Sequence, residues 1–537
     1  MTPKTSPKSP LRRSKPWPRC SPSPNRSNRP QGRCSRMTRA LAHLATVVLI
    51  SASMAQAAPK LADRSALQAG IAGLQQDATA MQVQGFGYDA VAQIAGLYGL
   101  TPAPRPQTQL DVTLPVGDAA KIAAGDTQIA LTQLSISEGT NNQLRVQQAQ
   151  HGSKAGIFIS AGVISLQDLA TAAQAQGIAG IAMADGVVTL SRPLVIWQGA
   201  TLLIHPGDVL QMQAAEGAFL LNFGQLDLRG ATLRSNVAAD APESQYRPFV
   251  LTSGSGQVYA EANQFQALGM ADLGPFAGFV ISTQGLFAST TPSVLRGNQF
   301  TDMGGVALIG TKGAQATQNA FLASRGGALT LAQVGQGAAL GNVIYQTKAG
   351  AGLRVTARSK DMLVAGNLVL GGQGNGIQVD GGSFGITLRG NAVLDNAQTG
   401  LAAKTASCLS VQDNVIAANG AVGLRLTKTG YVQVTGNALV NNAGSAIAVG
   451  AQLTKARLDL SGNLLAQNQI GLTGAALQLV TLRDNDLSAQ LPRIFDGEFA
   501  QHQAAYLTAG RTDHAAIFQI SSAAAQDADF ASICAQE

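Results

Sequence analysis

The second half of the chain repeats a pattern of short apolar segments separated by Gly and Asn. From about residue 290, an Asn stands just before a short apolar segment nine times, at steps of 21 to 26 residues with a mean of about 23. These positions are Asn298, Asn319, Asn342, Asn367, Asn391, Asn414, Asn437, Asn463 and Asn485. Six glycines repeat in phase and open segments of alternating apolar and polar residues, namely Gly305, Gly327, Gly352, Gly376, Gly400 and Gly423.

Each repeat predicts two or three strands of about three to five residues, joined by turns. One such unit cannot bury its apolar side alone, whereas stacked units can, and Asn side chains can bond to one another along the stack. Gly and Asn also tolerate the left-handed backbone that tight corners need. A leucine-rich repeat has a similar period, but its Leu-x-x-Leu-x-Leu-x-x-Asn spacing is missing. The pattern therefore predicts an all-β, pectin-lyase-like fold, a right-handed parallel β-helix over residues 181–490.

Residues 58–180 are expected to form a helical region, a linker and a cap. Between residues 61 and 100, apolar residues recur at helical spacing on two faces, with Leu67, Ile71, Leu74 and Met81 on one and Val91, Ile94 and Tyr98 on the other. Three prolines at 102, 104 and 106 then indicate a linker. A further helix is expected at 166–176, capped by Ser165 and ended by Gly177.

Two further patterns flank the repeats. After Asp185 the apolar period becomes two, which predicts short strands at 187–196, 200–204, 218–221 and 225–228. Residues 491–537 lose the repeat, and the segments 498–507 and 522–535 are typical of helices. Because an open end of the stack would expose unpaired strand edges, we expect residues 491–537 to form a C-terminal cap.

Charge is distributed unevenly along the chain. The formal net charge is +7, yet residues 1–58 hold eleven basic residues and no acidic one, which leaves 26 basic against 30 acidic residues elsewhere. A basic nucleic-acid-binding surface is therefore not supported for the folded part. The low charged fraction of 12% suits a stack of small uncharged surface positions.

The basic N-terminus indicates export. Arg39 precedes an apolar run from Ala40 to Ala55 that ends in Ala55-Gln56-Ala57, which is typical of a secretory signal peptide. We expect residues 1–57 to be a basic tail and cleaved signal peptide, with Met37 as an alternative start, and the mature protein to begin near Ala58 in the periplasm. A retained anchor is the alternative, although the run is short for a membrane span.

Cysteines and histidines give little sign of a metal or cofactor. Two cysteines, Cys408 and Cys534, remain after the expected cleavage, and neither lies in a metal-ligand pattern. They are expected to be unpaired structural thiols. No cofactor is predicted.

The strand alternation places one row of side chains on the outside of the predicted solenoid. In Gly352-Leu353-Arg354-Val355, Leu353 and Val355 are expected to point inward and Arg354 outward. The same alternation assigns Leu329, Gln378, Ala402 and Arg425 to the outside, in a row with ~4.8 Å between coils. Arg358, Asp380, Lys404 and Lys428 are expected at the strand ends beside it.

Cations in such a row suit the carboxylates of a polyuronate, because Arg binds a carboxylate with two parallel hydrogen bonds. The predicted substrate-binding residues are therefore Arg354, Arg358, Gln378, Asp380, Lys404, Arg425 and Lys428. The alternative is that these charges are only solvated on a solenoid surface.

Several dispersed segments resemble the periplasmic mannuronan C5-epimerases of alginate biosynthesis. They are Gly186-Val-Val-Thr-Leu-Ser-Arg-Pro-Leu-Val-Ile, Gly199-Ala-Thr-Leu, Gly217-Ala-Phe-Leu-Leu-Asn, Tyr246-Arg-Pro-Phe-Val and Val258-Tyr259, within a resemblance that covers about residues 160–490. The resemblance implies a β-helix that converts mannuronate to guluronate within an anionic exopolysaccharide. It also implies work beside other periplasmic polysaccharide-export proteins.

The chain departs from this family at the expected base. The family carries Asp-Pro-His-Asp after a strand-opening glycine, whereas this chain has Gly327-Ala-Leu-Thr-Leu-Ala, with Leu331 in the place of the His. Arg358 lies one position from the family's carboxylate-binding Arg, and Asp380 matches an Asp two coils along.

Epimerisation needs a cation on the substrate carboxylate, a base for the C5 proton and an acid on the opposite face. Arg354 or Arg358 could neutralise the carboxylate, and Tyr345 or Lys348 could replace the base, although a surface-covering Tyr is the simpler interpretation. Two hypotheses result, an active C5-epimerase with a substituted base and a non-catalytic scaffold that guides or protects a polysaccharide during export.

Overall fold

The computed structural model describes residues 58–79, 86–105, 114–138, 143–238, 240–270, 274–283, 291–512, 518–521 and 534. All of them belong to one compact unit, Ala55–Glu537. The expected signal peptide, Met81 and nearly all of the expected helix 522–535 lie outside the described residues. In the part of the chain that is described, no helix is long and apolar enough to cross a membrane.

Each coil of the solenoid contributes one short strand to each of three sheets. Sheet C contains β3 (Ile181–Ala184), β4 (Val187–Leu190), β7 (Val209–Met212), β10 (Thr232–Ser235), β13 (Gln264–Gln266), β16 (Gln299–Thr301), β19 (Ala320–Leu322), β22 (Val343–Tyr345), β25 (Leu368–Leu370), β28 (Ala392–Leu394), β31 (Val415–Ala417), β34 (Ala438–Val440) and β37 (Leu464–Ala466).

Sheet B follows sheet C within each coil. It contains β1 (Lys121–Asp126), β2 (Ala155–Ser165), β5 (Leu194–Ile196), β8 (Leu220–Asn222), β11 (Val250–Ser253), β14 (Gly278–Ser282), β17 (Gly305–Ile309), β20 (Leu329–Ala332), β23 (Leu353–Thr356), β26 (Ile377–Val379), β29 (Leu401–Lys404), β32 (Leu424–Thr427), β35 (Ser445–Gly450), β38 (Ile470–Ala475) and β40 (Arg493–Gly497).

Sheet A completes the coil. Beginning from the second half of β2, it contains β6 (Ala200–Ile204), β9 (Gln225–Arg229), β12 (Gln257–Glu261), β15 (Val294–Arg296), β18 (Gln315–Thr317), β21 (Ala338–Leu340), β24 (Leu363–Ala365), β27 (Phe384–Arg389), β30 (Ser407–Gln412), β33 (Tyr431–Thr435), β36 (Arg457–Ser461), β39 (Leu479–Arg483) and β41 (Phe518–Ser521).

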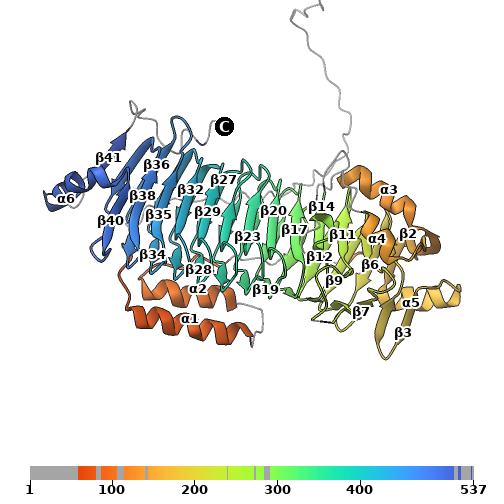
Figure 1. Ribbon diagram of the computed structural model, residues 1–537. Helices are drawn as coiled ribbons and strands as arrows, with labels where there is room; N and C mark the ends of the chain where they lie inside the picture. Colours follow the sequence, from red (N-terminus) through yellow and green to blue (C-terminus); the bar gives the residue numbers. More distant parts are fainter. Residues whose placement is uncertain are drawn as a thin grey trace, which may run out of the picture. The chain divides into compact units, whose positions relative to one another are not determined.

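Pairing between coils is parallel and in register, and the predicted parallel β-helix is confirmed (Figure 1). The parallel pairing begins at β2, before residue 181, and continues to β40, beyond residue 490. Inside the solenoid, like side chains stack on like. The rings of Phe265, Phe300 and Phe321 follow one another with centroids 4.8 and 5.1 Å apart.

The repeating Asn residues form the expected ladder at the corner between sheets A and C. Asn391, for example, accepts bonds from the backbone N of Asn367 at 3.0 Å and from its Nδ2 at 2.9 Å, and donates its own Nδ2 to Asn414. A second ladder, which the sequence analysis did not predict, follows five residues later and contains Asn396, Asn419, Asn442 and Asn468, ending on Gln490. These bonds satisfy buried corner groups that would otherwise lack partners.

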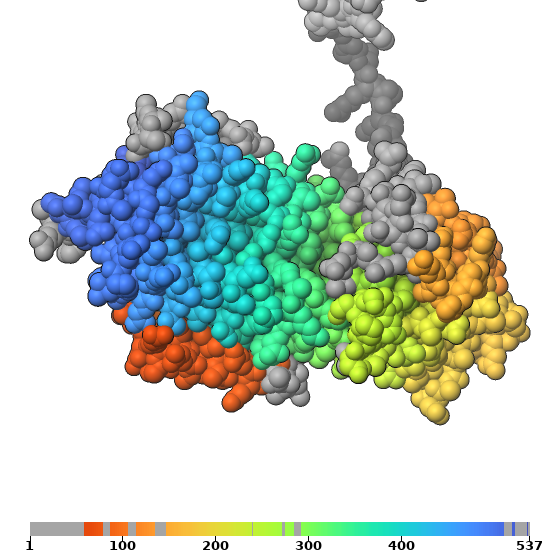
Figure 2. All heavy atoms as spheres, in the orientation of Figure 1, coloured from red at the N-terminus to blue at the C-terminus, as the bar shows by residue number. Residues whose placement is uncertain are grey.

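The N-terminal helices α1 (Arg64–Thr79) and α2 (Phe86–Leu97) pack as a hairpin against the outer face of sheet C (Figure 1). The apolar residues predicted on the two helices, including Leu67, Leu74 and Ile94, meet outward residues of sheet C such as Leu368 and Leu370 in one buried cluster. Figure 2 shows this hairpin, in red, along the side of the blue coils.

Both ends of the solenoid carry additional elements. Near the first coils lie α3 (Thr127–Glu138), α4 (Gln143–Ala149) and α5 (Leu166–Ala175), and the predicted cap of α5 is confirmed because Ser165 Oγ accepts from Asp168 N at 3.1 Å. At the other end, β40 leads to α6 (Gln503–Thr512), and β41 pairs antiparallel with β39.

The expectation of two free thiols is wrong. Cys408, in β30, forms a disulfide with Cys534, at a Cα–Cα distance of 5.6 Å and a sequence separation of 126 residues. No local pattern predicts this pairing, because the two cysteines lie 126 residues apart and only the folded chain brings them together. The disulfide therefore ties the end of the chain to the middle of the solenoid.

Candidate functional site

One row of outward side chains runs along sheet B through the middle and end of the solenoid. The strand register aligns Thr330 with Arg354, Arg354 with Gln378, Gln378 with Ala402 and Ala402 with Arg425. The row continues through Ala448 and Thr473. Arg354 and Arg425 are thus three coils apart, as the alternation predicted, and both are exposed. We call the positions from Thr330 to Thr473 the open row.

One predicted position on this row is corrected. Leu329 pairs with Leu353 rather than Arg354, and its side chain is fully buried in the core, so Thr330 takes the outward place. Ala328 adds one residue between Gly327 and the strand, and an added residue reverses the inward and outward assignment of every residue after it. Leu331, at the expected place of the base, is also fully buried and points inward.

Asp380 is the centre of a hydrogen-bonded cluster at the edge of the open row. Its carboxylate accepts a hydrogen bond from Arg354 Nε at 3.1 Å and forms an ion pair with Nη2 of the same arginine at 2.9 Å. It also accepts hydrogen bonds from the side chains of Thr356 and Gln378. Burial alone would raise the pKa of Asp380, but the bonds from Thr356, Gln378 and Arg354 outweigh it and lower the pKa below its ordinary value. Asp380 is therefore ionised and paired at neutral pH.

Thr356 is a member of this cluster that was not predicted from the sequence. Thr356 follows Arg354 by two residues, so both point outward from β23, and Thr356 lies at the strand end nearest Asp380. The i, i+2 spacing of Arg354 and Thr356, repeated by Gln378 and Asp380 on the next coil, was the signal that could have revealed all four residues together.

Four cations beside the cluster lack protein partners. Arg358, Lys404, Arg425 and Lys428 are all exposed. Within the described ranges, none of the four makes a side-chain hydrogen bond or ion pair. Arg425 borders a cavity of about 290 Å³ that is also lined by Thr427 of the same strand and by Ala448 and Thr473 of the next two coils. Arg358 follows β23, Lys404 ends β29, and Arg425 and Lys428 belong to the coil of β32, so the four cations are spread over the four coils from β23 to β32.

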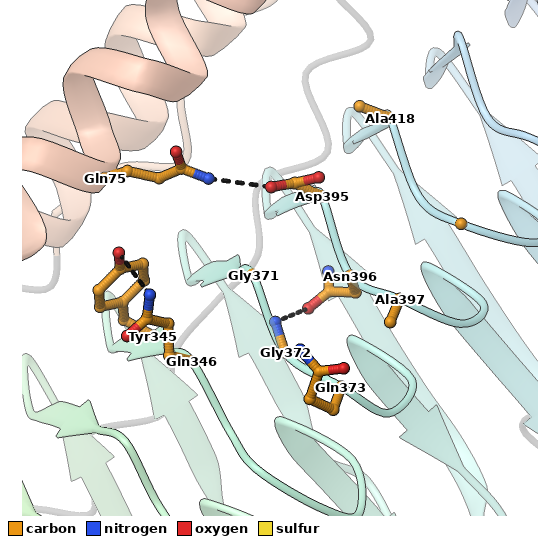
Figure 3. A pocket seen from close by; sticks show the side chains of 11 residues that line it. Gln75, Tyr345, Gln346, Gly371, Gly372, Gln373, Asp395, Asn396, Ala397 and Ala418 are labelled. Carbon is orange, nitrogen blue, oxygen red and sulfur yellow. Dashed lines mark hydrogen bonds between the residues drawn. The ribbon is translucent and has the colours of Figure 1, made fainter.

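The two residues expected to replace the base lie away from the open row. Tyr345 ends β22 in sheet C and is 7% exposed, and its hydroxyl accepts from Gln346 Nε2 at 2.9 Å. It lines a cavity of about 340 Å³ at the corner beside α1, where Gln75 Nε2 donates to Asp395 at 2.9 Å (Figure 3). Lys348 is paired with Asp302 at 3.4 Å. The structure does not bring Tyr345 together with Arg354 or Arg358.

Geometrically, the molecule is a parallel β-helix whose sheet B carries an open polar row. Comparisons with known proteins agree with this class. The family model described as "Periplasmic copper-binding protein (NosD)" matches residues 279–472, which is less than half of the chain. A search of curated proteins finds no match.

Among solved structures, this chain is similar to the periplasmic alginate epimerase AlgG. The identity is 18%, the TM-score is 0.62, and the match covers 71% of this chain and 95% of that one. The A-module of the mannuronan C-5 epimerase AlgE6 from Azotobacter vinelandii matches at 14% identity and a TM-score of 0.35, over 62% of this chain and 91% of that one. The first similarity establishes a shared fold, and the second is too distant to support an argument.

The copper named in the family description does not fit the residues present. Residues 279–472 contain no His, and their one cysteine, Cys408, is in the disulfide. Met303 and Met362, the methionines of this segment, are buried in the core. Among the described residues, no group of three or more His, Cys, Asp or Glu is placed to hold a metal ion. Soft copper ligands are therefore lacking in this segment.

Proposed function

We propose that the open row of sheet B binds an anionic polysaccharide, a polyuronate of the alginate kind, in the periplasm. The observation that supports this proposal most is the charge along the row. Arg354 is neutralised by Asp380, whereas Arg358, Lys404, Arg425 and Lys428 have no protein partner within the described ranges. Four exposed cations without a protein partner beside one row attract a polyanion.

The spacing of the row supports a polymer rather than a single sugar. Neighbouring coils lie ~4.8 Å apart, so equivalent side chains repeat at the scale of one sugar residue along an extended chain. Arg425 can bind a carboxylate through two parallel hydrogen bonds, and Lys404 and Lys428, both toward the C-terminal end of their strands, add point charges nearby. The cluster around Asp380 offers hydroxyl and amide groups to sugar hydroxyls.

Two observations support a periplasmic location for this protein. The disulfide between Cys408 and Cys534 is of the kind that persists in oxidising compartments. Both AlgG and the matching family are described as periplasmic, which agrees with the expected signal peptide. Other periplasmic export proteins remain predicted partners.

Catalytic conversion of mannuronate to guluronate is the second candidate function. The fold shared with AlgG and the Arg354–Asp380 cluster on the open row favour it. A base for the C5 proton is the missing part, because the lowered pKa of Asp380 makes it a weak base and Tyr345 belongs to sheet C. Binding without conversion is therefore the function that the geometry supports best.

The test compares two exposed arginines on different sheets. Arg425→Ala removes a free cation of the open row, and Arg483→Ala, its control, removes an exposed arginine of sheet A. By calorimetric titration with polymannuronate, we expect Arg425→Ala to weaken binding about tenfold, the loss of one charge-assisted hydrogen-bonded pair. Arg483→Ala should change it less than about twofold. Equal affinities in all three proteins would contradict the proposal.

A second measurement separates binding from catalysis. Polymannuronate is incubated with the protein in deuterium oxide, and deuterium at C5 is read by NMR. We expect no exchange above the protein-free control. Exchange that Asp380→Asn abolishes would instead establish the epimerase.

A further inference from the structure

The row that binds polymer in the proposal above continues beyond Thr330, but its character changes. In register with Thr330, the outward positions of the earlier coils of sheet B are Ala307, Val280, Leu251, Leu221 and Val195. Ala307 is 8% exposed, and the other four are completely buried. One continuous row is thus apolar and covered in its first part and polar and open in its second part.

A second layer covers the first part of the row. Phe219, Phe249 and Phe276 pack over it, with the first two rings stacked at a centroid distance of 5.0 Å and the third tilted at 4.8 Å from the second. Ala130, Leu131 and Leu134 of α3 join the same buried cluster, together with Met270. Figure 1 shows α3 and α4 beside β11 at this end of the solenoid. We call this covering layer of α3, Met270 and the three phenylalanines the wall. A polymer that follows the open row toward the first coils therefore meets the wall at Ala307.

The wall is fixed to the solenoid rather than loosely attached. The side chain of Arg325 is 2% exposed and donates Nη2 to the carbonyls of Leu268 at 3.0 Å and Gly269 at 2.5 Å. Arg325 also forms an ion pair with Asp302. Arg247, just before β11, forms an ion pair with the same carboxylate at 3.3 Å. A Cβ at Gly304 would lie 2.1 Å from the carbonyl oxygen of Ala277, so these backbones are in tight contact.

The opposite end of the open row has no such cover among the described residues. Ala448, Thr473 and, on the last coil, Asp496 are all partly exposed. The row from Thr330 to Thr473 spans six coil steps, or about 29 Å at ~4.8 Å per step. It is therefore a groove that is closed at one end and open at the other.

We infer that the open row binds the terminus of a polyuronate chain, with the last sugar at Thr330 against the wall and the rest of the chain extending toward Thr473. This inference rests on the proposed function, because it concerns how the same polymer lies on the same row. A groove open at both ends would accept any internal stretch of the polymer. A groove with a closed end accepts only a stretch that stops there.

Stoichiometry tests this inference with the unmodified protein. Polymannuronate preparations of two known mean lengths, both several times longer than the row, are titrated at equal chain concentration, and bound protein per chain is measured by analytical ultracentrifugation. We expect one protein per chain at both lengths. Protein bound in proportion to chain length would overturn the inference while leaving the proposed function intact. Absence of binding at both lengths would overturn both.

A matched pair of substitutions locates the terminus. Thr330 and Thr473 occupy the two ends of the open row with similar exposure. A mannuronate tetramer placed against the wall covers Thr330 but does not reach Thr473. We therefore expect Thr330→Trp to weaken tetramer binding about tenfold by steric overlap, and Thr473→Trp to leave it within about twofold. Circular dichroism confirms that both variants fold, and equal effects of the two would overturn the inference.

Blocking each chain end separately identifies which terminus is held. The probes are a tetramer with a bulky fluorophore on its reducing end and one with a bulky group on its non-reducing end. One of the two should lose at least about tenfold in affinity and the other should not. Retained affinity in both would contradict end recognition.

Discussion

Sheets B and C are built from the same repeat but present opposite outer faces. Inside the solenoid both contribute buried aliphatic residues, such as Val355 from sheet B and Val369 from sheet C. Outside, Leu368 and Leu370 of sheet C are covered by the helical hairpin, whereas the corresponding strand of sheet B presents Gln378. The inward residues therefore determine the solenoid, and the outward residues determine whether a face binds its own chain or remains free for another molecule.

The same contrast appears within sheet B. Its first coils carry outward Leu and Val beneath α3 and the phenylalanine layer, and its later coils carry outward Thr, Arg and Gln. Outward apolar residues thus mark covered surface in two separate places. This regularity makes the open row a distinct surface rather than an arbitrary strip of the solenoid.

The largest effect is expected from a charge placed on the covered face. Leu370→Asp puts a carboxylate under α2 on a side chain that is 1% exposed, and an uncompensated buried charge costs about 3–5 kcal/mol. The matched change Ala402→Asp on the open row should alter the free energy of unfolding by less than about 0.5 kcal/mol. Urea denaturation measures both.

The same pair also distinguishes the faces by function. Ala402→Asp should weaken polymannuronate binding because it places a negative charge, of the same sign as the polymer, beside Lys404 and Arg425. A stable Leu370→Asp protein together with an unfolded Ala402→Asp protein would reverse the assignment of the two faces.

A smaller loss of stability is expected from a change in the Asn ladder, which supports the coils that carry both faces. Asn391→Ala removes a side chain that accepts from Asn367 and donates to Asn414 and to the carbonyl oxygen of Val364. Because buried partners are left unpaired, we expect a loss of about 2–3 kcal/mol. Polymannuronate affinity below the unfolding transition should be unchanged. The two measurements together distinguish residues that stabilise the solenoid from residues that bind the polymer.

Two aspartates at different corners should respond oppositely to pH. The pKa of Asp380, beside sheet B, is lowered by its hydrogen bonds, so the ionised form stabilises the fold above about pH 4, and this stabilisation is lost as pH falls through the lowered pKa. Asp380→Asn should therefore cost about 1–3 kcal/mol at pH 7 and progressively less below pH ~4.

Asp395, at the corner that follows sheet C, has a raised pKa because burial outweighs the bond from Gln75. Its ionisation at pH 7 opposes folding, and this cost disappears as pH falls below the ordinary value. Asp395→Asn should therefore be neutral or slightly stabilising at pH 7. Melting temperatures of both variants at pH 7 and pH 4 provide the check, and parallel shifts in the two would contradict the different environments.

Much of this fold could be predicted from the sequence, because a repeat of about 23 residues with fixed Asn and Gly positions leaves few alternatives. The outward assignment was correct for Arg354, Gln378, Ala402 and Arg425, since each follows its glycine by the same number of residues. It failed at Leu329, where one added residue reversed the alternation. The second Asn ladder was visible as a five-residue offset from the first.

The remaining features depend on contacts between distant segments. The pairing of Cys408 with Cys534, the hairpin over sheet C and the wall over the first coils of sheet B join segments far apart in sequence. No local pattern encodes such contacts. The pairing of Arg354 with Asp380 also depends on side-chain geometry between neighbouring coils, and the alternation of inward and outward residues does not encode it.

The central claim is that the open row of sheet B binds polyuronate, and lysine footprinting tests it most directly. The protein is acetylated with and without saturating polymannuronate, and modification rates are read by mass spectrometry. The account predicts that Lys404 and Lys428, exposed beside the open row, become protected, while Lys121 and Lys154, exposed near the first coils, react at unchanged rates. Protection of Lys121 and Lys154 with Lys404 and Lys428 unaffected would contradict it.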